Sequence, residues 1–346
     1  MLSQMIQDFM DEGKRVSRWT LKTVDEYEAV YSLFLRIVSD MPVGSLSYPV
    51  MREYKQTLLR LPPNMNKSPL YRGKTVKQIL NMKIRKSLSP SSINKALTRV
   101  SSLFKWAVKN GYIQANWAEG MHIATGKTPQ QERKAYTVGE LNRLFNSPRY
   151  TKDTFTSPYM FWLPAMGLFT GCRLEELCQL HLEDIREVCG VWVLDINDNG
   201  VKRVKTANSK RLVPIHPFLL ELNLPGYAQE LQNQGHDRLF PEITSYRDGF
   251  GHKPSRWFND RFKKTVGINE IGKDFHSFRH TFITQLKQSQ VDYVMLKEVV
   301  GHVVEGETLG RYGKRFSPDI VFERLVSRLE YPGLHIGHLL TSRYAR

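Results

Sequence analysis

The residues most able to do chemistry in this 346-residue chain lie in four short segments. The first, TGCRLEEL, places Arg173 three residues before Glu176, and this spacing is also typical of an ordinary ion pair on a helix surface. The second contains Lys205, which lies at the end of a predicted strand beside a tight turn, where lysines are usually solvated. A guanidinium group binds phosphate oxygens bidentately and keeps its charge, so the first segment could serve an anionic substrate.

The third segment, HSFRH, brings a titratable base and a fixed cation within about one helical turn. Its members are His276, Arg279 and His280. Two histidines at this i, i+4 spacing could instead bind a metal ion in a nuclease. Such a site also needs carboxylates, and the stretch HSFRHTFITQLKQS supplies none, so the sequence gives that alternative little support.

The fourth segment, VVGHVVEGETLGRYGKRF, combines Gly301-His302 with Tyr312 ten residues later. A tyrosine is normally a half-buried packing residue, and Tyr312 alone would indicate no more than that. A tyrosine hydroxyl, with a pKa of about 10 in water, is a weak nucleophile at neutral pH. It could attack phosphorus only with a base nearby and with cations that favour the phenolate.

Taken in order, these segments resemble the signature boxes of the tyrosine recombinases, the phage-integrase family. The shared pattern is an arginine, a lysine, His-x-x-Arg, Gly-His and a tyrosine. The stretch SPSSINKALTRVSSLFKWAVKNGYI is similar to the end of that family's core-binding domain. The resemblance covers roughly residues 18–330, and it is far more specific than any single segment because five boxes must fall in the right order.

The resemblance implies a phosphate-binding role for four residues. Arg173 and Arg279 would clamp the scissile phosphate, and His302 would hydrogen-bond one of its oxygens. Glu176 would be the supporting carboxylate that holds this cluster. Two arginines would then supply the charge stabilisation that other nucleases take from metal ions.

The resemblance also implies roles for the groups that move protons and form bonds. Tyr312 would attack phosphorus and become a 3′-phosphotyrosine, while His276 would assist proton transfer at this nucleophile. Lys205 would protonate the leaving 5′ oxygen, which is a strong base. Because the broken ester is stored as a protein ester, religation would need no ATP, and no cofactor or metal is expected.

The implied function is a site-specific recombinase or integrase that cleaves and rejoins double-stranded DNA, serving a phage or mobile element. A homo-tetramer would assemble on two DNA sites in synapsis. Two alternatives stay open: a type IB topoisomerase-like enzyme that relaxes DNA, and a catalytically inactive DNA-binding regulator. A compact helical N-terminal domain favours recombination, and a binding module would have no need for a nucleophile at Tyr312.

The charge of the chain independently indicates a polyanionic partner. Lys and Arg number 50 against 34 Asp and Glu, which gives a net charge of +16. No acidic residue lies between Glu53 and Glu119, where thirteen Lys and Arg would repel one another unless an anion such as the phosphate backbone neutralised them. The predicted DNA contacts in this stretch are Lys83, Arg85, Lys86, Lys95 and Arg99.

The amino-acid composition indicates the cellular compartment in which the protein is expected. Three cysteines in so long a chain do not form a disulfide framework, which favours a reducing compartment. Acidic residues interrupt the N-terminus where a signal peptide would need an apolar stretch, and no run of about 18 apolar residues occurs. We therefore expect a cytoplasmic, nucleoid-associated protein without a membrane span.

The patterning predicts a mainly α fold with a small antiparallel β-sheet (α+β). Apolar spacing indicates helices over residues 20–40, 48–60 and from Ser89 to Asn110, and hence a helical core-binding domain over residues 1–120. The polar stretch 121–135 predicts a linker. A tyrosine-recombinase catalytic domain is expected over 136–330, opened by a capping box at Thr137, and a C-terminal tail over 331–346.

Within the catalytic domain, helices are expected near 158–170, 173–182, 276–289 and 291–300. A three-strand meander is expected from VWVLDI, VKRVKT and RLVPI, with turns at 197–200 and 207–209. The tail is apolar enough to dock on a neighbouring protomer or to pack in cis, and the sequence favours neither.

Overall fold

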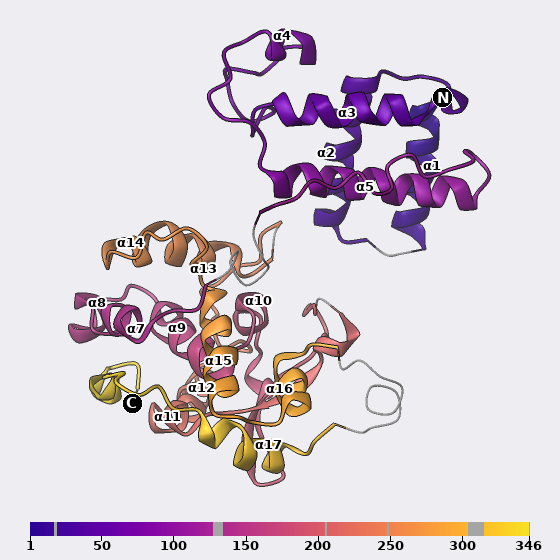
Figure 1. The fold of residues 1–346 in the computed structure, drawn as a ribbon. Coiled ribbons are helices and arrows are strands. Elements are labelled where there is room, and N and C mark those ends of the chain that lie inside the picture. Colours follow the sequence, from indigo (N-terminus) through magenta and orange to yellow (C-terminus); the bar gives the residue numbers. More distant parts are fainter. Residues whose placement is uncertain (17–18, 127–133, 205, 248, 304–314, 346) are drawn as a thin grey trace. The chain divides into compact units, whose positions relative to one another are not determined.

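The fold is mainly helical with one small sheet, and it divides into two compact units, Met1–Thr128 and Pro129–Arg346 (Figure 1). A computed structural model describes all residues except 17–18, 127–133, 205, 248, 304–314 and 346. The expected fold class, mainly α with a small antiparallel sheet, is confirmed. Among the described residues, no helix combines the length and the hydrophobicity that a membrane span requires.

Unit 1 (Met1–Thr128) is a helical bundle built around aromatic side chains. Its helices are α1 (Leu2–Arg15), α2 (Leu21–Val38), α3 (Tyr48–Arg60), α4 (Val76–Leu80) and α5 (Pro90–Lys109). Phe34 of α2 is fully buried, with its ring centroid 4.8 Å from that of Tyr54 and 6.0 Å from that of Phe104. Helix α2 thus packs between α3 and α5 in the core of this unit.

The three helices expected in this unit are confirmed, and their starts follow the expected chemistry. The side chains of Thr20 and Ser89 cap α2 and α5, each accepting a hydrogen bond from a backbone N–H three residues on. Helix α1 was not expected. Its buried residues Leu2, Met5 and Phe9 recur at helical spacing and close the bundle against α2 and α5.

The stretch 121–135, expected to be a linker, is anchored at both of its ends. Met121 is buried in unit 1, and the amide side chain of Asn94 exchanges two hydrogen bonds of 2.8 Å with the backbone of Ile123. At the other end, Lys134 pairs with Glu270 of unit 2. Polar composition concealed these anchors, because Asn94 is distant in sequence; the middle of the expected linker, 127–133, lies outside the described residues.

Unit 2 (Pro129–Arg346) is organised around α9 (Pro158–Thr170), which is buried at every residue from Phe161 to Thr170. Helix α15 (Ser277–Gln288) packs closely against α9. The other α-helices of four or more residues in the described part of this unit are α7 (Val138–Phe145), α8 (Pro148–Thr151), α10 (Leu174–Cys178), α11 (Pro217–Glu221), α12 (Leu224–Asn233), α13 (His252–Arg256), α16 (Tyr293–Val300) and α17 (Pro318–Arg324). A π-helical turn (Trp257–Phe262) and α14 (Lys263–Thr265) continue α13.

The sheet has three antiparallel strands, but one of them differs from the expectation. The strands are β1 (Ile185–Val188), β2 (Val191–Ile196) and β3 (Arg211–Pro214), in the order β1-β2-β3. Ile185 lies opposite Leu194, and Leu194 lies opposite Val213. The expected middle strand VKRVKT is therefore wrong: β2 is the middle strand, and β1 is the third strand of the sheet, at its edge.

Two features explain why β1, and not VKRVKT, pairs with β2. They are the turn at Cys189-Gly190 and the side chain of Gln179. Cys189 and Gly190 both have positive φ values, 53° and 75°, so they close a two-residue hairpin between β1 and β2. Cysteine is not a usual residue for such a turn. In the connection from β2 to β3, the backbone N–H and C=O of Arg203 bind the amide of Gln179 instead of a neighbouring strand.

The C-terminal tail packs in cis, which decides a question the sequence left open. Tyr331 is buried, its hydroxyl donates a hydrogen bond of 2.8 Å to the backbone oxygen of Leu168, and its ring lies edge-on to Phe169. Near the end of the chain, the Tyr344 ring stacks on Phe161 with centroids 5.3 Å apart. The tail therefore completes the cover of α9.

We expect Tyr331→Ala to lower the free energy of unfolding of unit 2 by about 3 kcal/mol, because it empties a buried aromatic site. Tyr331→Phe removes only the hydrogen bond and should cost about 1 kcal/mol. Calorimetry of the full chain measures both, since the two units can unfold in separate transitions. Tyr246→Ala, at a tyrosine that is 69% exposed, is the control; an equal loss there would contradict cis packing of the tail.

Candidate active site

The site is built on a carboxylate at the start of α10. Glu176 is 4% exposed, and its Oε2 accepts a hydrogen bond of 2.9 Å from the backbone N–H of Arg173. The Arg173 guanidinium donates to Oε1 of the same carboxylate at 2.6 Å. The pair expected from the sequence is therefore present, but Glu176 is buried and is not part of a solvated helix surface.

Arg279 joins the HSFRH segment to the same place. It is 2% exposed, and its guanidinium donates to the backbone oxygens of Gly171, at 2.8 Å, and of Val300. Gly171 has a φ of +62°, and a Cβ on it would lie 2.5 Å from the ring of Phe282 on α15. Only glycine permits this close approach, so the Gly171 turn brings the first and third segments together.

Arg211, at the start of β3, is a member of the cluster that the sequence analysis missed. It is 5% exposed, and its Nη2 lies 2.8 Å from Oε2 of Glu176. Its Nε donates to the backbone oxygen of Val299 at 2.5 Å. One signal could have found it: the strand RLVP alternates, which puts Arg211 on the same buried face as Val213.

The electrostatics follow from three guanidinium groups around one carboxylate. Burial alone would raise the pKa of Glu176, but the charges and hydrogen bonds of Arg211 and Arg173 outweigh it and lower this pKa to about 2. Burial, together with the charges of Arg173 and Arg211, lowers the pKa of Arg279 to about 10, so it stays protonated at neutral pH. The cluster therefore carries an excess of positive charge.

His302 lies at the end of α16, beyond its left-handed cap Gly301. It is exposed on the surface of unit 2. Partial burial and the charges of Arg279, Arg173 and Arg211 lower the pKa of His302 to about 4. The imidazole is therefore neutral at pH 7, where it can donate one hydrogen bond and accept another.

His276 occupies the N-cap position of α15, one turn before Arg279. Its ring centroid lies 5.1 Å from that of His280, with the two rings nearly perpendicular. At the start of the helix His276 is half-buried, while Arg279 one turn later is buried.

Two of the residues predicted from the sequence, Lys205 and Tyr312, lie outside the described residues. The chain just before Lys205 is strongly anchored. Lys202 is 4% exposed, and its ammonium group lies 2.7 Å and 2.9 Å from the two carboxylate oxygens of Asp184. After Tyr312, the Arg315 guanidinium donates to the backbone oxygens of Asn208, at 3.1 Å, and of Lys210.

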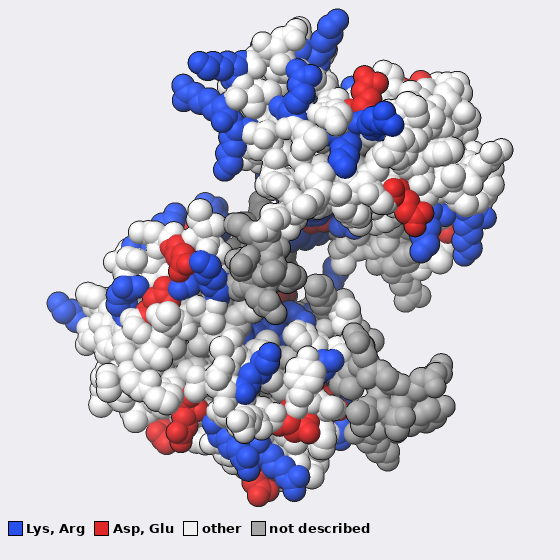
Figure 2. Space-filling view, in the orientation of Figure 1, with Lys and Arg blue, Asp and Glu red and all other residues white. Residues whose placement is uncertain are grey.

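The five residues predicted to contact DNA fall into two groups in unit 1. Lys83, Arg85 and Lys86 are exposed in the connection between α3 and α5, where Lys and Arg side chains crowd the end that carries α4 (Figure 2). Lys95 and Arg99 instead both pair with Glu26 of α2, at 3.0 Å and 2.9 Å. Glu26 lies outside the acid-free stretch between Glu53 and Glu119, and it supplies the counter-charge for both of these side chains.

Removing the charge of Glu176 should change how stability depends on pH. Its folded pKa of about 2 lies below the ordinary 4.5, so it contributes about 3 kcal/mol above pH 4.5, and this is lost as the pH falls towards 2. Glu176→Gln should therefore be less stable than the parent at pH 7 and nearly equal to it at pH 2. Urea unfolding at several pH values measures the difference, with exposed Glu221→Gln as control; a constant difference would contradict the pairing.

Comparisons with known proteins identify the fold of this chain and the family to which it belongs. The chain matches the model of the phage integrase family over residues 137–316, more than half of its length. The tyrosine recombinase XerC of Thermodesulfovibrio yellowstonii is 24% identical over 233 residues, which cover 66% of this chain and 72% of that protein.

Two solved structures share the fold at low sequence identity. The integrase of transposon Tn1549, in complex with transposon right end DNA, is 17% identical with a TM-score of 0.58, over 94% of this chain and 99% of that one. A lambda integrase tetramer bound to a Holliday junction is 16% identical with a TM-score of 0.57, over 88% and 75%. The resemblance stated from the sequence is thus confirmed: the chain belongs to the phage integrase family and is a tyrosine-type site-specific DNA recombinase.

Proposed function

We propose that this enzyme cuts one strand of duplex DNA with Tyr312 and later rejoins it, using no metal and no ATP. The observation that carries the proposal is the cluster of Arg173, Arg211 and Arg279 around Glu176. Three guanidinium groups and one carboxylate leave two positive charges uncompensated. A phosphodiester that gathers negative charge during attack is the kind of anion that such a site stabilises.

In this mechanism, Arg173 and Arg279 bind the non-bridging oxygens of the scissile phosphate. Neutral His302 donates a hydrogen bond to one of these oxygens, and the lowered pKa of His302 supports that form at pH 7. Because the donors are held before DNA arrives, little reorganisation is needed when charge develops.

The phenolic oxygen of Tyr312 attacks phosphorus as its proton passes to His276. The bond from phosphorus to the 5′ oxygen breaks, and Lys205 gives that oxygen a proton. The product is a 3′-phosphotyrosine, and a 5′ hydroxyl reverses the same steps to rejoin the strand. Support for these two assignments comes from their described neighbours: Lys202 pairs with Asp184 directly before β1, and Arg315 binds the backbone oxygen of Asn208 shortly before β3.

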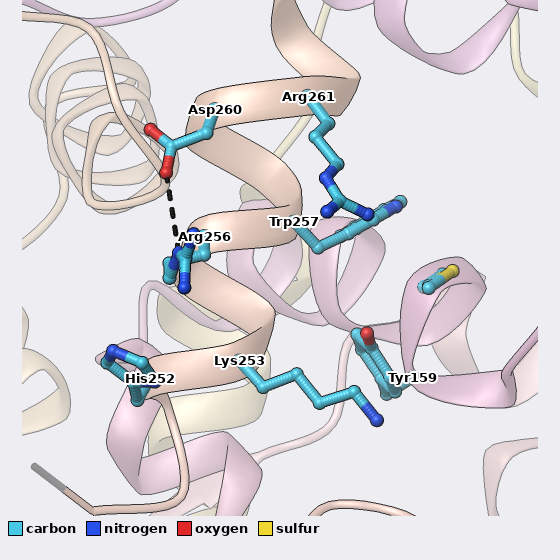
Figure 3. Close-up of a pocket in the computed structure, with 8 residues that line it drawn as sticks. Tyr159, His252, Lys253, Arg256, Trp257, Asp260 and Arg261 are labelled. Atoms are coloured by element: carbon cyan, nitrogen blue, oxygen red, sulfur yellow. Dashed lines mark ion pairs between the residues drawn. The ribbon is translucent and has the colours of Figure 1, made fainter.

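We infer that unit 1 and unit 2 both contact the DNA backbone. In unit 1 the candidate surface is the α3–α5 connection with Lys83, Arg85 and Lys86. In unit 2 a recess of about 310 Å³ is lined by Lys253, Arg256 and Arg261. Figure 3 shows Lys253 and Arg261 on one side of the helical segment and Arg256 turned to the other side, where it pairs with Asp260. Positive side chains on both units suit a polyanion that is long enough to reach both.

We further propose that four copies assemble on two DNA sites, and that the enzyme serves a phage or mobile element in the cytoplasm. Support comes from the related structures, one of a lambda integrase tetramer on a Holliday junction and one of a transposon integrase. An attachment repeat beside the gene is the observation that tests the origin.

The nucleophile is tested with a nicked DNA substrate whose short 5′ fragment is lost after cleavage, which traps the covalent complex on a denaturing gel. The parent should form the complex, and Tyr312→Phe should lower its rate at least about a thousandfold, because no other group is expected to form the ester. Tyr293→Phe, at an exposed tyrosine upstream, is the matched control and should react normally. A complex formed by Tyr312→Phe would overturn the assignment.

The same enzyme on a plasmid with two sites separates recombination from simple relaxation. Exchange between the sites should give new linked fragments. Relaxed plasmid without exchanged products would favour the topoisomerase-like alternative, and binding without any covalent complex would favour the inactive regulator.

The backbone contacts of unit 1 are tested by the salt dependence of DNA binding. Changing Lys83, Arg85 and Lys86 to Gln should flatten the slope of log affinity against log salt by about 2 to 3, since each lost phosphate contact removes about 0.9. Changing Lys95 and Arg99 should flatten it less, because Glu26 already pairs with them. Exposed Lys152→Gln is the control; an unchanged slope in the triple variant would exclude this surface.

A further inference from the structure

We propose that Arg211 is a positioning residue of the recombination reaction, holding Arg173 and His302 in place without touching the DNA. This inference rests on the proposed function. It concerns a residue that lies outside all five signature boxes, at the first position of β3.

The first support is that every N–H of this guanidinium already has a partner. Nε donates to the backbone oxygen of Val299, Nη1 lies 2.7 Å from the backbone oxygen of Ser209 and 3.3 Å from Glu176, and Nη2 lies 2.8 Å from Glu176 and 3.5 Å from the sulfur of Cys172. A guanidinium has five N–H groups, so none remains for a phosphate. Arg211 can therefore act only through the groups it holds.

The second support is the set of elements that these bonds connect. Glu176 belongs to α10 and in turn binds the backbone and side chain of Arg173. Val299 belongs to the last turn of α16, where backbone oxygens lack partners within the helix. One buried cation thus links the helix that begins with Arg173 to the helix that ends before His302.

The third support is the exit of the chain from α16. Gly301 has a φ of +66°, and a Cβ on it would lie 3.1 Å from Nη1 of Arg211. The backbone at Gly301 therefore lies directly against the guanidinium, and Arg279 holds the neighbouring backbone oxygen of Val300. The two arginines together fix the direction in which the chain leaves towards His302.

Lysine could not replace this group, although it has the same charge. Its ammonium group is a point donor on a flexible stem, whereas the planar guanidinium reaches Glu176, Ser209 and Val299 in fixed directions. Arg211→Lys should therefore keep a cation beside Glu176 and lose the contact to α16, which isolates positioning from charge.

The test measures single-turnover formation of the covalent complex on the nicked substrate, together with DNA affinity. Arg211→Lys should lower the rate about tenfold and Arg211→Met about a hundredfold, as expected for displaced catalytic groups, with affinity changed less than about threefold. Arg238→Lys is the matched control, because Arg238 also binds two backbone oxygens, of Ile243 and Cys178, and lies outside the cluster. Its rate should stay within about twofold of the parent.

The pH profile gives a readout that a purely structural role would not move. Glu176 faces Arg173, Arg211, Arg279 and the thiol of Cys172. Without Arg211, the pKa of Glu176 rises, so the rate of Arg211→Met relative to the parent should fall further as the pH is lowered. Adding Glu176→Gln should remove this additional pH dependence, because no carboxylate remains to be protonated there.

The outcomes separate this inference from the proposed function. A parent that forms no covalent complex defeats the proposed function. A parent that reacts, with Arg211→Lys folded and as fast as Arg238→Lys, defeats the role of Arg211 alone. If Arg211→Met does not fold, the rate and pH profile of Arg211→Lys decide, with a loss of rate at unchanged affinity as the supporting result.

Discussion

A single buried carboxylate, Glu176, holds the cationic site together. Alone in the interior it would be costly, and burial by itself would raise its pKa. Arg211 and Arg173 reverse that effect with charge-assisted hydrogen bonds and keep the carboxylate ionised. Breaking such a pair leaves an uncompensated charge in the interior, so each partner constrains the others. Because one carboxylate holds the guanidinium groups, the cluster keeps a net excess of two positive charges even when no substrate is bound.

The fold supplies the remaining support through helix ends. Arg279 binds backbone oxygens at the end of α9 and at the end of α16, and Arg211 binds another at the end of α16. The carboxyl ends of helices carry partial negative charge, so these oxygens favour guanidinium groups. Because these backbone oxygens carry no full negative charge, the cluster keeps the excess positive charge that would attract a phosphate.

The two units differ in how far their positive side chains are exposed to solvent. In unit 2 Arg211 and Arg279 are buried and bound to backbone oxygens, which suits stabilisation of charge at one site. In unit 1 Lys83, Arg85 and Lys86 are exposed, which suits contacts along a backbone. Arg99 belongs to neither group, because it pairs with Glu26 and its guanidinium lies 4.3 Å from the ring centre of Tyr27. An intramolecular role in the α2–α5 packing accounts for it.

Local sequence was enough for features that depend on neighbours in the chain. It predicted α2, α3, α5 and α9, because apolar spacing and caps are local. The grouping of Arg173, Glu176 and Arg279 was implied by the ordered family pattern and not by local spacing. That pattern also placed the family correctly.

Tertiary packing decided whatever depends on partners distant in sequence. The stretch VKRVKT resembles a strand, yet Lys202 is drawn to Asp184 and Arg203 to Gln179, and no local pattern contains those partners. Arg211 was not among the predicted site residues, because its partners Glu176 and Val299 are distant from it in sequence. The tail was undecided between two docking modes until its tyrosines were found against α9. A buried charge and a docked tail each depend on interaction partners that are distant in sequence, and only the folded chain places those partners beside them.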